Sequence, residues 1–243
     1  MKQNIYDDPD FFSKYGNLAR SQQGLSAAGE WKAFRSLLPS LQGAKVLDLG
    51  CGYGWHCRYV SEQGASSVIG VDISEKMLAQ AKTLNSLPGI SYLQSAIEDL
   101  KLEKNQFDLV MSSLAFHYVA DFQVICRMIF EALKPGGQLV FSMEHPIFTS
   151  RPQQDWIYSE SGEILYWPVD QYQNEGMRKT SWLADNVIKY HRSMSTIVNS
   201  LLETGFKLEK LVEPTVPPEM LEKHPEYEAE NRRPMFLLVS AKK

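Results

Sequence analysis

The stretch VLDLGCGYG, residues 46–54, decides the fold. A short apolar run that carries Asp48 leads into glycines at alternate positions, Gly50, Gly52 and Gly54. A ligand can approach the main chain closely only where no β-carbon intervenes, and glycine provides that access. The residues that follow are predicted to open a helix, whose free amides and positive end would face the ligand. We therefore expect a strand, a ligand-binding turn and a helix in this order.

A second acid follows roughly 20 residues later, at the spacing typical of nucleotide-binding folds. The apolar run VIGVDI, residues 68–73, carries Asp72 near its end. A carboxylate at the end of a strand can accept two hydrogen bonds from a ribose diol. The two acids and the glycines together predict a site for a nucleoside.

Short apolar runs alternate with helix-period segments along the chain, which favours strands buried on both faces of a parallel sheet. Strands are expected at residues 46–49, 68–73, 90–93, 107–111 and 138–141, with a last one in the C-terminal FLLVSAKK. Right-handed crossovers then give an α/β, doubly wound sheet, and we expect its last strand to be antiparallel.

Apolar stripes at helical spacing indicate the connecting helices. One follows Ser74, whose hydroxyl can cap its first amides. Another covers residues 122–133 and is stopped by KPGG, and a third covers 194–202 before Gly205.

Two regions interrupt this rhythm within what we expect to be a single domain, residues 1–243. Residues 1–40 are predicted to form a helical N-terminal cap rich in aromatic side chains. Residues 144–192 are far longer than an ordinary connection and suggest a lid or substrate-binding insert after the fifth strand. The pair Arg232 and Arg233, before the last strand, is expected in a solvated turn.

The insert mixes aromatic and basic residues, which permits two interpretations. They are Trp156, Tyr158, Tyr166, Trp167, Tyr172, Trp182 and Tyr190, with Arg151, Arg178, Lys179 and Arg192. Aromatic walls with one cation would fit a small acidic or aromatic metabolite. Alternatively, the insert packs on itself and its charges are solvated.

Composition excludes several classes of protein. The 243 residues are 44% hydrophobic and 22% charged, as in soluble globular proteins. The formal net charge is -4, whereas a protein that captures phosphate backbones usually has a basic excess. Three cysteines give no disulfide framework, and no apolar stretch or basic N-terminal signal indicates a membrane span or secretion. We expect a cytoplasmic protein that binds neither nucleic acid nor membrane.

Details of the loop distinguish between nucleotide ligands. A dinucleotide fingerprint requires glycine or alanine five residues after the first glycine, where this chain has Trp55. Asp48, just below the loop, would repel a pyrophosphate but suit a ligand with an ammonium group. S-adenosylmethionine combines a ribose with such an amino-acid tail.

The combination of DLGCGYG, Asp72 and KPGG resembles the class I S-adenosylmethionine-dependent methyltransferases, most clearly over residues 40–143. The resemblance implies a seven-stranded, mostly parallel sheet and S-adenosylmethionine as cofactor. It places the methionine part at the glycine loop, the ribose at Asp72 and the adenine against Ile73 and SAIEDL. The cofactor-binding residues it implies are Asp48, Gly50, Cys51, Gly52, Gly54, Asp72, Ile73, Met77, Ala96, Ile97, Glu98 and Ser113. Arg20, in the N-terminal cap, could pair with the cofactor carboxylate.

Catalytic candidates lie after the fourth and fifth strands, where doubly wound sheets place their ligands. They are His117, Glu144 and His145, together with His191 before the last long helix. A base is needed only if the acceptor atom must lose a proton. His117 could instead pack under the cofactor, and His145 could be a turn residue fixed by Pro146. No local spacing such as HExxH indicates a metal.

The sequence therefore predicts an enzyme, monomeric or homodimeric, that methylates a small molecule, with oxygen favoured as the acceptor atom. One alternative is a non-catalytic cofactor-binding partner subunit. The other is a nicotinamide-dependent oxidoreductase, which Trp55 disfavours.

Overall fold

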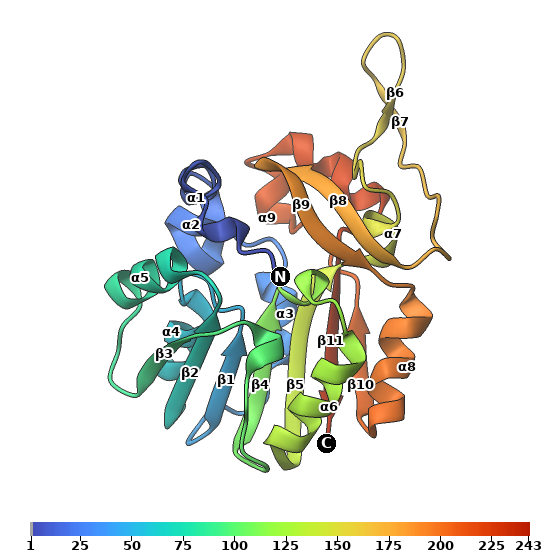
Figure 1. Cartoon of the computed structure of the whole chain (residues 1–243). Helices are drawn as coiled ribbons and strands as arrows, with labels where there is room; N and C mark the ends of the chain where they lie inside the picture. Colours follow the sequence, from blue (N-terminus) through green and yellow to red (C-terminus); the bar gives the residue numbers. More distant parts are fainter. Residues whose placement is uncertain (1) are drawn as a thin grey trace.

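The computed structural model describes residues 2–243. At its centre is a seven-stranded sheet in the order β10-β11-β5-β4-β1-β2-β3 (Figure 1). The strands are β1 (Lys45–Leu49), β2 (Ser67–Asp72), β3 (Ile90–Gln94), β4 (Phe107–Ser113), β5 (Leu133–Glu144), β10 (Lys207–Val212) and β11 (Phe236–Lys242). Only β11 runs antiparallel to its neighbours, β5 and β10. The predicted doubly wound sheet with an antiparallel last strand is confirmed.

Two strands differ from their prediction. β5 begins at Leu133, so KPGG forms the first part of a strand, and the preceding helix ends one residue earlier than expected. β10 has the sequence KLEKLV and lies at the sheet edge, where only two of its residues are even partly buried. An edge strand exposed to this extent lacks the continuous apolar run by which the central strands were located.

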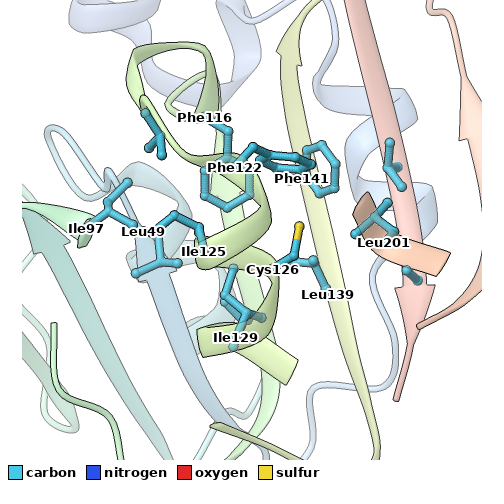
Figure 2. Packing of buried hydrophobic residues seen from close by; sticks show 14 of the residues in the cluster. Leu49, Ile97, Phe116, Phe122, Ile125, Cys126, Ile129, Leu139, Phe141 and Leu201 are labelled. Atoms are coloured by element: carbon cyan, nitrogen blue, oxygen red, sulfur yellow. The ribbon is translucent and has the colours of Figure 1, made fainter. Parts of the chain in front are cut away.

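Helices cover both faces of the sheet and bury two clusters of apolar side chains. One face carries α3 (Trp31–Leu37), α4 (Trp55–Glu62) and α5 (Glu75–Leu84), and the other carries α6 (Phe122–Ala132) and α8 (Met194–Thr204). Figure 2 shows the α6 side, where Ile125, Cys126 and Ile129 point at the sheet beside Phe141. Full burial of each such aliphatic or aromatic side chain contributes about 1.5–3 kcal/mol.

Helix caps agree with the sequence. The Ser74 hydroxyl accepts a hydrogen bond from the amide of Met77 at 3.0 Å and caps α5. Gly205, with φ +106°, ends α8 in the left-handed conformation, where glycine carries no steric cost.

The elements outside this core gather at one end of the sheet. The N-terminal part contains η1 (Ile5–Asp7), α1 (Pro9–Gly16), α2 (Ala19–Gln23) and η2 (Gly24–Ala27). The insert contains α7 (Pro146–Thr149) and two hairpins, β6 (Ile157–Tyr158) with β7 (Ile164–Tyr166) and β8 (Gly176–Trp182) with β9 (Ala184–His191). A C-terminal segment contains α9 (Pro218–Leu221) and η5 (Pro225–Arg232).

Figure 1 shows α1, α2, the β8–β9 hairpin and α9 above the carboxyl ends of the parallel strands, with the β6–β7 hairpin projecting away. Ligands of doubly wound sheets bind at that end. Within residues 2–243, no helix combines the length and apolar character required to cross a membrane.

Candidate functional site

The glycine loop adopts backbone conformations that other residues avoid. Gly50, Gly52 and Gly54 have φ values of +74°, +53° and +76°. A β-carbon on Gly50 would lie 2.4 Å from the β-carbon of Ala115, and one on Gly54 would lie 2.3 Å from the Tyr92 hydroxyl. Positive φ therefore favours glycine at all three positions, and close packing excludes a β-carbon at Gly50 and Gly54.

The carboxylate of Asp72 faces this loop. One oxygen accepts a hydrogen bond from the amide of Gly52 at 2.8 Å and the other from the amide of Ser74 at 2.9 Å. Burial raises the pKa of Asp72 to about 6, although the amides of Ser74 and Gly52 oppose the rise. Each oxygen keeps further acceptor capacity, so the pair can receive the two hydroxyls of a ribose.

Asp48 occupies a different place from the one expected. Its carboxylate is fully buried beneath the loop and accepts the thiol of Cys57 at 3.2 Å. Burial raises its pKa to about 7. The side chain does not reach the cavity wall, so the geometry gives no direct contact with a ligand ammonium group. Gly54 likewise lies off the wall, against Tyr92.

A cavity of about 990 Å³ opens beside the loop. Eleven of the thirteen predicted cofactor-binding residues line it: Arg20, Gly50, Cys51, Gly52, Asp72, Ile73, Met77, Ala96, Ile97, Glu98 and Ser113. The motifs quoted from the sequence are thus brought together around one space.

The N-terminal cap contributes a polar corner to the cavity. Nη2 of Arg20 donates to both carboxylate oxygens of Glu30, at 2.6 and 2.8 Å. Nε1 of Trp55, also on the wall, is buried and has no hydrogen-bond acceptor within residues 2–243. Sequence reasoning missed Trp55 as a donor because it considered this position only for the size of its side chain.

His117, in the short helix η4 (Phe116–Tyr118) after β4, and Glu144, the last residue of β5, both line the cavity. Nδ1 of His117 accepts the amide of Glu144 at 3.3 Å, so the neutral ring carries its proton on Nε2. Burial lowers the pKa of His117 to about 4, against the influence of the Glu144 charge. At neutral pH the ring is an uncharged donor and is poorly suited to accept a proton.

The other two catalytic candidates lie away from the cavity wall. Nε2 of His145 contacts Glu213 at 2.9 Å, and its Nδ1 accepts the amide of Ile147 at 3.1 Å. His145 is therefore a helix-capping residue, as its place before Pro146 allowed.

His191 is held by Thr149 and the carbonyl of Tyr172, at 2.8 and 2.9 Å. Both ring nitrogens are occupied, so the geometry gives His191 no access to a substrate.

The insert combines both interpretations of its composition. Trp182 and Tyr190 line the cavity. Trp156 and Trp167 do not line it, and they pack edge to face on each other with their ring centres 5.2 Å apart. None of the four basic residues that the sequence offered for an acidic metabolite supplies a free cation to the cavity. Arg178 and Arg192 donate to main-chain carbonyls, while Arg151 and Lys179 are absent from the wall.

The prediction of a solvated turn is wrong for Arg233, which is buried. Its neighbour Arg232 is exposed as expected. Arg233 is 7% exposed, and its guanidinium lies 4.3, 4.9 and 5.2 Å from the ring centres of Trp167, Phe148 and Trp156. A weakly hydrated guanidinium can stack on aromatic faces in this way.

Sequence reasoning also missed Lys189, Gln154 and the segment 214–236, all of which contribute to the cavity wall. One signal was present: Val187, Lys189 and His191 alternate along β9, and all three are buried. Their period of two places the lysine on the inward face. Within residues 2–243, no three His, Cys, Asp or Glu side chains gather as a metal ion would require.

Comparison with known proteins agrees with this geometry. A family model for a methyltransferase domain matches residues 47–141. The crystal structure of a Listeria monocytogenes protein is similar with a TM-score of 0.86 at 48% identity, over 90% of this chain and 99% of that one. An S-adenosylmethionine-dependent methyltransferase from Mesorhizobium loti gives a TM-score of 0.85 at 45% identity, over 90% of this chain and all of that one.

A sequence relative of named activity extends the comparison. The ubiquinone biosynthesis O-methyltransferase of Idiomarina loihiensis is 31% identical over 193 residues, 72% of this chain and 76% of that protein. These similarities leave no support for a nicotinamide oxidoreductase or a non-catalytic subunit. The chain belongs to the class I S-adenosylmethionine-dependent methyltransferases, and S-adenosylmethionine is its methyl donor.

Proposed function

We propose that this enzyme methylates a small molecule, at oxygen, inside the cavity beside the glycine loop. The observation that carries the proposal is the continuity of that cavity. One space of about 990 Å³ is lined both by Gly50 and Asp72 and by Glu144 and Trp182. Its volume is at the upper end of the roughly 300–1,000 Å³ of small-molecule sites, which leaves room for an acceptor beside the cofactor.

The residues present fit S-adenosylmethionine. A β-carbon on Gly50 would displace the loop that the methionine part needs, and Asp72 offers two carboxylate oxygens to the ribose. The unpaired Nε1 of Trp55 and the guanidinium of Arg20 are donors suited to a carboxylate. Ile73 and Ile97 offer apolar contact to the adenine.

The cofactor supplies a methyl group on a sulfonium. Held by the glycine loop and Asp72, the bound cofactor would give this methyl group to the acceptor oxygen with S-adenosylhomocysteine as the leaving group, and the hydroxyl proton would pass to solvent. The chain must hold the two reacting atoms about 3–3.5 Å apart and exclude water. The segments above the sheet provide the enclosure, and His117 can donate its Nε2 proton to orient an acceptor oxygen.

Two observations favour oxygen as the acceptor atom. The relative from Idiomarina loihiensis is named as an O-methyltransferase. Within residues 2–243, the wall near Glu144 carries the hydroxyls of Tyr6 and Tyr118, 3.2 Å apart, beside the imidazole of His117. Hydroxyl and imidazole groups can orient an acceptor hydroxyl by hydrogen bonding.

Isothermal titration with S-adenosylhomocysteine tests the proposal. We expect micromolar or tighter binding to the full chain, weakened at least tenfold in Asp72→Ala because the ribose loses two acceptors. Normal binding by Asp72→Ala would remove the ribose assignment, and no binding by the wild type would remove the cavity assignment.

The same titration at different pH values sharpens the test. The pKa of Asp72 is about 6, so its carboxylate gains a proton as the pH falls from 7 to 5. The neutral acid is a weaker acceptor, and affinity should fall severalfold over that range. Asp72→Asn should bind S-adenosylhomocysteine more weakly than the wild type at pH 7. Its affinity should then fall less between pH 7 and pH 5, and that smaller fall reports the residual effect of Asp48.

A further inference from the structure

The cations on the cavity wall are already paired. Of the described residues that line the cavity, the lysines and arginines are Lys2, Arg20 and Lys189. Lys2 pairs with Asp99, Arg20 with Glu30 and Lys189 with Glu144. A carboxylate or phosphate on an acceptor would therefore find no unneutralised lysine or arginine among these residues, and burial of an unpaired charge is costly.

We call the part of the cavity wall around Glu144 and Lys189 the acceptor side. The ion pair of these two residues is part of a closed polar network. Nζ of Lys189 donates to Oε1 of Glu144 at 2.5 Å and to Oε1 of Gln154 at 3.0 Å. The amide of Gln154 donates in turn to the second oxygen of Glu144 at 2.9 Å. We call these three side chains the polar triad.

The polar triad is buried although it lines a cavity. Lys189 is 2% exposed and Glu144 is 12% exposed. Its members come from β9, from the end of β5 and from the loop after α7, so the insert must fold over the sheet to assemble them. Charges held at such burial interact strongly with each other and tolerate little excess charge nearby.

The surroundings of the triad are aromatic. The ring centre of Trp182 lies 5.6 Å from Nζ of Lys189, and Tyr118 and Phe148 also line the cavity. An acceptor here meets aromatic walls, the uncharged polar groups of Tyr6, Tyr118 and His117, and the triad, whose two charges sum to zero.

We propose that the polar triad recognises the acceptor and selects an uncharged, planar molecule that carries a hydroxyl or carbonyl group. This inference rests on the proposed function and names its substrate class. The ammonium keeps one donor and the carboxylate keeps lone pairs, so the triad can bind a neutral polar group from either side. An ionic group would meet a charge of its own sign beside the opposite one, and it would have to break the buried Glu144–Lys189 pair or remain without a counter-charge.

Three phenols of one skeleton test the charge rule: 4-hydroxybenzyl alcohol, 4-hydroxybenzoate and 4-hydroxybenzylamine. Each is titrated by NMR, at millimolar concentration and pH 7.5, into full-length protein saturated with S-adenosylhomocysteine. The wild type should bind the alcohol at least tenfold more tightly than either ion. Glu144→Gln, which leaves Lys189 unpaired, should shift the preference at least tenfold toward the benzoate. Lys189→Met should shift it equally toward the amine.

The double variant Glu144→Gln with Lys189→Met provides the decisive comparison. It removes both charges, so preference for the alcohol should return, with weaker binding than in the wild type. It also keeps the test available if either single variant, with one buried charge unpaired, fails to fold. Lys179→Met is the matched control: it removes an exposed ammonium from the same hairpin and should leave all three affinities unchanged.

The outcomes separate this inference from the proposed function. If the wild type does not bind S-adenosylhomocysteine, the proposed function fails. If it binds the cofactor product but prefers an ion, or binds none of the three phenols, the inference is wrong. It is equally wrong if Glu144→Gln and Lys189→Met, where they fold, keep the wild-type order of affinities, or if the double variant binds the alcohol as tightly as the wild type does.

Discussion

The two sides of the cavity are built in different ways. The cofactor side depends on main-chain conformation: Gly50 and Gly52 have positive φ, and Asp72 is held by main-chain amides. The acceptor side depends on side chains from distant segments, such as Lys189 against Glu144, 45 positions apart in the sequence. One side is a local motif, whereas the other exists only after the insert has folded over the sheet.

This difference predicts how each side responds to substitution. Where the main chain forms the site, one added carbon should abolish binding. Where side chains from several segments form it, a substitution should weaken the packing of those segments and leave cofactor binding intact.

The largest effect is expected for Gly50→Ala. The new β-carbon would lie 2.4 Å from that of Ala115, and φ is +74°. The loop must move, so affinity for S-adenosylhomocysteine, measured by titration calorimetry, should fall at least roughly 50-fold, more than 2 kcal/mol.

Gly43→Ala is the matched control for this prediction. Gly43 also has φ +74°, but its β-carbon would meet nothing within 4 Å. Both variants carry about 1–2 kcal/mol of left-handed strain, and only Gly50→Ala adds the collision. Equal affinities in the two variants would mean that the conformation of the loop does not form the site.

An intermediate effect, on stability rather than cofactor binding, is expected for Arg233→Ala. The guanidinium lies over Trp167, Phe148 and Trp156 and joins the insert to the segment before β11. Loss of these contacts should lower the free energy of unfolding by about 2 kcal/mol, measured by urea denaturation. Affinity for S-adenosylhomocysteine should stay within about twofold, since Arg233 does not line the cavity.

Arg232→Ala provides the comparison for that measurement. Arg232 is exposed, donates to the carbonyls of Ile164 and Leu165 and lies 5.2 Å from the ring centre of Trp156, so its removal should cost less than that of Arg233, about 0.5–1 kcal/mol. If the two arginine variants have the same stability, the buried stack of Arg233 contributes no more than the exposed contacts of Arg232.

The same contrast explains how much could be predicted from the sequence. Alternating apolar runs located the central strands, and the glycine spacing located the loop, because each is a local consequence of backbone chemistry. The edge strand β10 was not located because its exposed residues carry no apolar run.

The acceptor side was predicted less well because its contacts join segments far apart in the sequence. His145 and His191 stand beside predicted ligand-binding ends, yet Glu213 and Thr149 hold them elsewhere. Arg233 is next to a proline in a polar stretch, and nothing local indicates the aromatic rings that bury it. Such residues find their partners only through tertiary packing.

The N-terminal cap combines features of both sides of the cavity, since side chains hold it against a main-chain helix end. Substitution of Asp7 tests its contribution, and the expected effect is the smallest of those considered. Its carboxylate accepts the Ser74 hydroxyl at 2.5 Å and the amide of Lys76 at 3.1 Å, at the start of α5. Asp7→Asn removes the charge at this helix N-terminus, a loss of about 0.3–1 kcal/mol. Since Ile5 and Tyr6 line the cavity, affinity for S-adenosylhomocysteine should fall about threefold.

The pH dependence of the Asp7 contact has a definite sign. Burial alone would raise the pKa of Asp7. The hydrogen bonds from Ser74 and from the amides of α5 together lower the pKa by more than burial raises it, so the net shift is downward. A depressed pKa means that the stabilisation is present above the unfolded pKa and lost as the pH falls through the folded one. The difference in affinity between wild type and Asp7→Asn should thus be constant from pH 6 to 8. A difference that disappears within this range would show that the cap is held by residues other than Asp7.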